Sequence, residues 1–74
     1  MSAARLDEFL ARLAEVLEVP AITAGDDYRE TPLWGSLTCF AVKVMLMQQF
    51  GVELTLQTIG DCPSAGALAE KVIG

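Results

Sequence analysis

The chain has 74 residues, 53% of them hydrophobic, and its ten acidic and five basic residues give a formal net charge of −5 at pH 7. This length allows one domain, residues 1–74, and the apolar content excludes a disordered chain. The basic residues are scattered, so we expect no nucleic-acid partner. No apolar run reaches about 18 residues and no signal peptide is recognisable, so we expect no membrane span and a cytoplasmic protein.

The reactive side chains are few. Cys39 and Cys62 are the only cysteines and the chain has no histidine, so we expect no metal site and interpret both thiols as small, semi-buried residues. Asp26 and Asp27 are more typical of a turn than of a metal site. Ser36 has no candidate base near it in sequence, so we do not expect an enzyme.

The first predicted helix covers about residues 3–18. Its apolar residues recur at helical spacing and form one face: Leu6, Phe9, Leu10, Leu13, Val16 and Leu17. Ser2 is a plausible N-cap. We expect the helix to end before Val19-Pro20, because the residue before a proline is disfavoured in the α region.

A long connection should follow, over about residues 20–34. Gly25, Asp26, Asp27 and Pro32 interrupt it, and no periodicity persists. A loop of this length in a small domain is usually functional or locally packed. We expect Trp34 to tether it to the helices.

The second predicted helix runs from about Ser36, a good N-cap or first-turn residue, to Gln49, with Gly51 as the stop. Apolar residues nearly surround it, and in so small a domain it cannot be buried on every side. We therefore expect part of its apolar surface to be exposed for a partner, unless the first loop covers it. The candidates are Ala41, Val44, Met45 and Met47.

The last third of the chain has weaker signals. Residues 52–56 alternate like a short strand but have no partner strand, so we expect an extended connector, with a brief helical turn near residues 57–60. A final helix should begin near Ser64, after Pro63. The predicted fold is all-α, a small bundle of three or four helices with a long first loop.

These elements resemble those of the acyl carrier protein family. Gly35-Ser36-Leu37 is similar to the family's Asp-Ser-Leu motif at the start of the second helix. Phe50-Gly51-Val52-Glu53-Leu54 resembles the family's Phe-Gly-Val/Ile-Glu-Leu/Ile segment at the matching distance. The long first loop, the short third turn and the stretch over residues 67–73 also match in order, so the resemblance covers nearly the whole chain.

The resemblance implies a stand-alone, monomeric carrier with a covalent cofactor. A separate phosphopantetheinyl transferase would esterify Ser36 with 4′-phosphopantetheine, with Gly35 and Leu37 as the flanking motif. The thiol of this arm would carry acyl or aminoacyl groups as thioesters. The carrier would catalyse nothing, and would present its cargo to acyl-activating, synthase or transferase enzymes that dock mainly on the second helix.

The local chemistry suits this role, with one alternative. An anionic phosphodiester at a helix N-terminus meets free backbone N–H groups and the positive end of the helix dipole. Leu37 can anchor the turn so that the Ser36 hydroxyl points outward. The alternative for Ser36 is plain N-capping without modification.

Two departures from the family pattern point to a specialised carrier. Gly35 stands where the family usually has aspartate, although carriers of the peptide-synthetase type also place glycines near the serine. No acidic residue lies between Ser36 and Phe50, so docking should be apolar, through Leu37, Val44, Met45 and Met47. We expect a carrier for specialised fatty-acid, polyketide-type or secondary-metabolite synthesis; the alternative is an unmodified interaction module with the same fold.

Overall fold

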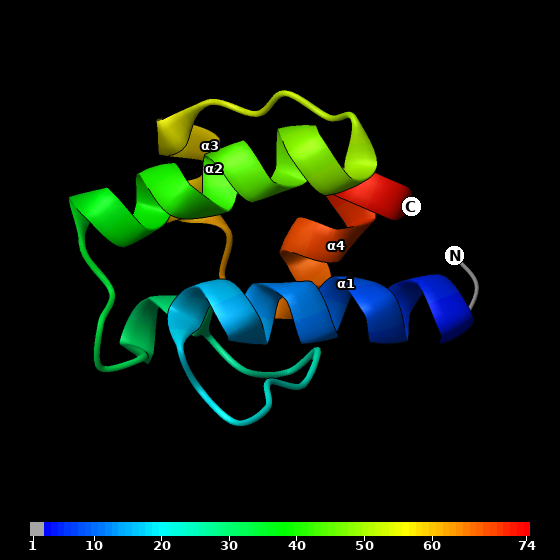
Figure 1. The fold of residues 1–74 in the computed structure, drawn as a ribbon, viewed down its shortest axis with the longest axis horizontal. Helices are drawn as coiled ribbons and strands as arrows, with labels where there is room; N and C mark the ends of the chain where they lie inside the picture. The colour runs from blue at the N-terminus through cyan, green and yellow to red at the C-terminus, as the bar shows by residue number, and fades with distance from the viewer. Residues whose placement is uncertain (1–2) are drawn as a thin grey trace.

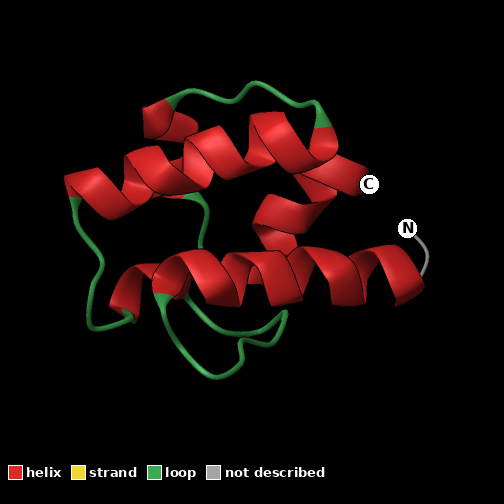
Figure 2. Ribbon diagram, in the orientation of Figure 1, coloured by secondary structure: helices red, strands yellow, loops and turns green. Residues whose placement is uncertain are grey.

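The computed structural model describes residues 3–74, and in this part of the chain it contains α-helices, one 3-10 turn and no strand (Figures 1 and 2). The elements are α1 (Ala3–Leu17), η1 (Tyr28–Glu30), α2 (Ser36–Phe50), α3 (Leu56–Asp61) and α4 (Ala65–Ile73). α1 and α2 run in opposite directions, α4 packs against both, and α3 packs against α2 (Figure 1). The prediction of a small all-α bundle with a long first connection is confirmed, and the brief turn expected near residues 57–60 is the helix α3.

One side of each helix supplies the core. The predicted apolar face of α1 is confirmed, because Phe9, Leu13 and Leu17 are fully buried. The remaining large, fully buried side chains come from the other elements: Tyr28, Val42, Leu46, Ile59 and Leu68. Burying one such side chain contributes about 1.5–3 kcal/mol, so these residues dominate the stability of the fold. None of the described helices is long and apolar enough to span a bilayer.

The two longest helices end with left-handed residues. At the end of α1, Glu18 has a φ of 57°, and the Val19 N–H donates to the Ala14 carbonyl at 3.1 Å. At the end of α2, the predicted stop at Gly51 is confirmed, with a φ of 68°. Both closures satisfy carbonyls of the last turn. α1 therefore ends at Leu17 through this closure, and the predicted N-cap Ser2 lies outside the described residues.

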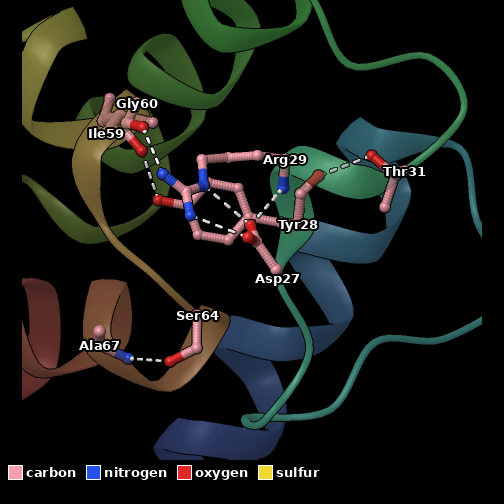
Figure 3. Close-up of polar contacts among 8 residues, drawn as sticks. All are labelled: Asp27, Tyr28, Arg29, Thr31, Ile59, Gly60, Ser64 and Ala67. Atoms are coloured by element: carbon pink, nitrogen blue, oxygen red, sulfur yellow. Dashed lines mark hydrogen bonds and ion pairs between the residues drawn. The ribbon is translucent and has the colours of Figure 1, made fainter.

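The first loop is tied to the start of α4. The predicted start of the last helix near Ser64 is confirmed. Ser64 is the N-cap of α4, and its hydroxyl accepts from the Ala67 N–H at 3.1 Å (Figure 3). The next two backbone N–H groups, at the start of α4, donate to carbonyls of the first loop. The Ala65 N–H reaches the Asp26 carbonyl, and the Gly66 N–H reaches the Ala24 carbonyl, each at 2.8 Å. These bonds fix the path of the loop toward η1.

The loop approaches Gly66 closely, which predicts opposite effects at two helical glycines. A Cβ at Gly66 would lie 3.0 Å from the Ala24 carbonyl oxygen, whereas a Cβ at Gly60 would meet nothing within 4 Å. Gly60→Ala should therefore gain about 0.5–1 kcal/mol from helix propensity. Gly66→Ala should gain nothing or lose stability, because the loop must move. Urea unfolding of the two variants measures the difference, and equal stabilisation of both would contradict the close packing.

Candidate functional site

The candidate site is the N-terminal end of α2, where Ser36 is exposed and is the first helical residue. The C-terminus of the chain lies near the opposite, C-terminal end of α2 (Figure 1). The Cys39 N–H donates to the Gly35 carbonyl at 2.9 Å, which opens the helix. Gly35 is thus the N-cap residue of α2, and as a glycine it has no side chain that could cap the first-turn amides. The Ser36 hydroxyl is not the N-cap, and the first-turn amides keep their capacity to bind an anion.

Backbone and side-chain contacts hold the segment of the loop just before Ser36. The Thr38 hydroxyl donates back to the Leu33 carbonyl at 2.6 Å, across the start of the helix. The Trp34 N–H donates to the Thr31 carbonyl at 3.1 Å, and the Trp34 ring packs edge-on against Tyr28 with 5.4 Å between the ring centres. Trp34 is also partly buried against the hydrophobic core, so its predicted tether role is confirmed. These contacts place Ser36 on a defined turn.

A clamp formed by η1 connects this loop to α3 (Figure 3). The Tyr28 hydroxyl donates to the Ile59 carbonyl, and the Arg29 guanidinium donates to the Gly60 carbonyl at 3.0 Å. Both carbonyls belong to the last turn of α3. Carbonyls in the last turn of a helix have no N–H donor within the helix itself. The donor four residues after Ile59 would be Pro63, which has no N–H. The clamp therefore replaces the missing helical donors of α3.

The acidic residues of the loop are engaged locally. Asp27 pairs with Arg29 through both carboxylate oxygens, at 2.9 and 2.8 Å, and hydrogen bonding to this guanidinium lowers the pKa of Asp27 below its ordinary value. The Asp26 carboxylate accepts from the Thr23 N–H at 2.8 Å. Both carboxylates thus organise turns, as expected from the sequence. The contact of Arg29 with the Gly60 carbonyl carried no sequence signal, because every residue has a backbone carbonyl.

The side of α2 that points away from the core is mostly apolar and includes Ser36. We call it the outer face, and it comprises Ser36, Leu37, Phe40, Val44 and Met47. These residues recur at spacings that place them on one side of a helix. Leu37 is 82% exposed, Phe40 51% and Met47 47%, while Val44 is half-buried. The first loop does not cover these residues, so α2 presents an exposed apolar surface directly beside Ser36.

Two sequence predictions about this surface need correction. The sequence predicts Met45 to be exposed for a partner, but it is buried, because helical spacing places it beside Val42 and Leu46 in the core. The sequence also predicts Leu37 to anchor the turn, but its side chain lies in solvent. Trp34 and Thr38 hold the turn instead. Phe40, which the sequence does not single out as a site residue, belongs to the outer face.

A groove of about 470 Å³ runs between α1 and α2 beside the outer face. Val16, Phe40, Ala41 and Val44 are among its apolar lining residues. Its polar lining includes Arg12 and Glu15, which form an ion pair at 2.7 Å. A second cavity, of about 590 Å³, lies between α1 and residues 19–24, and Ser36 does not line either one.

Other reactive groups are enclosed. Cys39 and Cys62 are buried free thiols, and burial raises the pKa of Cys39. Within residues 3–74, no cluster of three or more His, Cys, Asp or Glu side chains could hold a metal ion.

No protein-family model matches the sequence, and no curated protein matches it significantly. The exposed hydroxyl of Ser36 and its apolar surroundings are therefore the candidate functional features of this protein.

Proposed function

We propose that this protein is a carrier that holds acyl or aminoacyl groups on a 4′-phosphopantetheine arm attached to Ser36. The observation that carries the proposal is the position of Ser36, an exposed hydroxyl in the first turn of α2. A phosphodiester on this oxygen would lie next to first-turn amides that no side chain caps. The helix dipole and these amides stabilise such an anion by about 0.3–1 kcal/mol.

The space around Ser36 fits an attached group. A Cβ at Gly35 would meet nothing within 4 Å, so the turn is open on the side of the preceding residue. The loop contacts of Thr38 and Trp34 keep the turn in place without covering Ser36. A transferase can therefore reach the hydroxyl, which would form a bond to phosphorus as the adenosine bisphosphate part of coenzyme A leaves. The arm then supplies a thiol that carries the cargo as a thioester.

The chain's own residues would position this arm and present it to enzymes. Nothing in the sequence offers Ser36 a histidine base, so the chemistry on the cargo falls to partner enzymes of fatty-acid, polyketide-type or secondary-metabolite synthesis. The outer face of α2 begins at Ser36 and is the apolar surface nearest to the arm. The order of the helices and the distance from Ser36 to Phe50-Gly51 also resemble those of acyl carrier proteins.

Arm attachment tests the proposal directly. Incubating the folded protein with coenzyme A and a broad-specificity phosphopantetheinyl transferase should add the mass of one arm, located on Ser36 by peptide mass spectrometry. Failure of several unrelated transferases to modify the folded protein would contradict the proposal. Intact mass of the protein purified from its own host would then identify the cargo.

A second candidate function is an unmodified interaction module. It is favoured by the exposed outer face, which can bind a partner whether or not Ser36 is modified, and by Gly35 in place of the usual aspartate. In this case Ser36→Ala would bind its partner and sustain activity in the pathway. Complete loss of pathway activity in this variant would exclude the module and favour the carrier.

A further inference from the structure

We infer that the outer face of α2 and the adjoining groove bind the apolar side of an uncharged helix from a partner protein, without steering by charge. This inference goes beyond the proposed carrier function, because it specifies the chemistry of the partner and does not require the arm. It rests on the distribution of charge around α2, on the shape of the surface and on the polar contacts at its edges.

Few charged residues lie in and around α2 in the sequence. Between Glu30 and Glu53 the sequence has a single charged residue, Lys43, while the other residues hold all ten acids and four bases, a net charge of −6. The Lys43 ammonium donates to the Leu54 carbonyl at 2.8 Å, on the side of α2 toward the connector before α3. Five large hydrophobics are exposed in the described chain, and four of them lie within this stretch: Leu33, Leu37, Phe40 and Met47.

The opposite wall of the groove is also neutral overall. The charged residues that line the groove are Arg12 and Glu15 of α1, and they pair with each other at 2.7 Å. Gln48 and Gln49 line it from the end of α2 and carry no charge. A basic partner would be attracted to the acidic surface elsewhere on the molecule and would find no acid on the outer face.

The groove can receive a large side chain of a partner helix. Phe40 lines the groove of about 470 Å³ together with Val16, Ala41 and Val44. Leu37 is exposed on the outer face, three residues before Phe40. An amphipathic helix can place one large side chain in such a depression and lay its neighbours along the ridge. A second copy of the chain fits less well, because two molecules of charge −5 repel. A lipid surface also fits less well, because interfacial helices usually carry several lysines or arginines.

Selection from a library of helical peptides tests the inference directly. Random amphipathic peptides displayed on phage are selected on the wild-type protein, synthesised, and measured for Kd at about 50 and about 500 mM NaCl, a range that strongly changes screening. We expect the selected peptides to be apolar on one side and uncharged, with Kd changing less than about threefold over this range.

Matched variants locate the binding surface. Phe40→Glu should weaken binding at least about tenfold, because it places a charge in the centre of an apolar contact. Leu56→Glu on α3 is the control, since Leu56 has a similar exposure, 45% against 51% for Phe40, and should leave Kd unchanged. Circular dichroism checks folding, and Leu37→Glu, at an 82% exposed position, replaces Phe40→Glu if the latter unfolds.

Several outcomes would overturn the inference. These are selection of basic peptides with salt-sensitive binding, binding that neither Phe40→Glu nor Leu37→Glu weakens, or no peptide binding at all. A dimer in sedimentation that Phe40→Glu disrupts would assign the surface to self-association, and binding to phosphatidylcholine vesicles lost in the same variant would assign it to lipid. Arm attachment to these variants is measured separately by mass, so failure of the carrier function is distinguished from failure of this inference.

Discussion

Replacing Ser36 by alanine is expected to abolish arm attachment completely while leaving the fold intact. The substitution removes the hydroxyl oxygen to which the phosphodiester is proposed to be attached. The opening bond of α2, from the Cys39 N–H to the Gly35 carbonyl, involves no Ser36 atom. Alanine is also a strong helix former, so stability should change by less than about 0.5 kcal/mol. Intact mass after transferase treatment, together with thermal unfolding, measures both results.

Ser64→Ala is the matched control for this experiment. It is the same chemical change at the start of another helix, but the Ser64 hydroxyl caps α4 by accepting from the Ala67 N–H. Loss of this cap should cost about 1 kcal/mol, and the arm should still be attached. The two serines are therefore expected to show opposite effects on stability and attachment. An adduct of unchanged yield on Ser36→Ala would place the attachment elsewhere and refute the role of Ser36.

The sequence was sufficient for features that depend on local chemistry. Helical spacing identified the buried face of α1, including Phe9 and Leu13, because one polar side and one apolar side leave a single way to pack. Gly51 and Ser64 were predicted as helix boundaries because their backbone and side-chain preferences act within a few residues. The start of α2 at Ser36 followed from the same kind of signal.

Features that depend on contacts between distant segments could not be predicted. α2 has apolar residues on all sides, so its sequence does not indicate which side meets the core, and this ambiguity put Met45 on the wrong one. The clamp from Tyr28 and Arg29 ends on backbone carbonyls, 31 residues away in each case. A carbonyl has no residue-specific signal, so neither contact leaves a pattern in the sequence. Leu37 resembles an anchor in the sequence because a leucine beside a turn can pack on the core, and only the path of the chain shows that its side chain lies in solvent.

Tyr28→Phe is expected to destabilise the protein by about 1–3 kcal/mol, because it leaves a buried carbonyl without a donor. The Tyr28 hydroxyl donates to the Ile59 carbonyl, and Pro63 cannot supply an N–H in its place. The ring itself stays buried and keeps its contact with Trp34, so the variant isolates the hydroxyl. Chemical unfolding at neutral pH measures this loss. A change below about 0.5 kcal/mol would contradict the clamp.

The same hydroxyl predicts how stability depends on alkaline pH. Burial raises the pKa of Tyr28 well above its ordinary value of 10.0. Below pH 10 the tyrosine is neutral in both folded and unfolded chains, so it causes no pH dependence. Above that pH the unfolded chain loses the proton while the folded protein keeps it. The free energy of unfolding should therefore fall as pH rises, by at most about 1.4 kcal/mol per pH unit from this group.

Comparison of wild type with Tyr28→Phe isolates this contribution, because every other ionisable side chain is present in both proteins. The stability advantage of wild type should be constant up to about pH 10 and shrink above it. Arg29→Ala removes the donor to the Gly60 carbonyl but should retain the alkaline loss, since Tyr28 is still present. Tyr28 is the only tyrosine, so tyrosinate absorbance reports its ionisation directly. This absorbance should rise only as the protein unfolds, and ionisation near pH 10 in the folded protein would show that the hydroxyl is not held by the clamp.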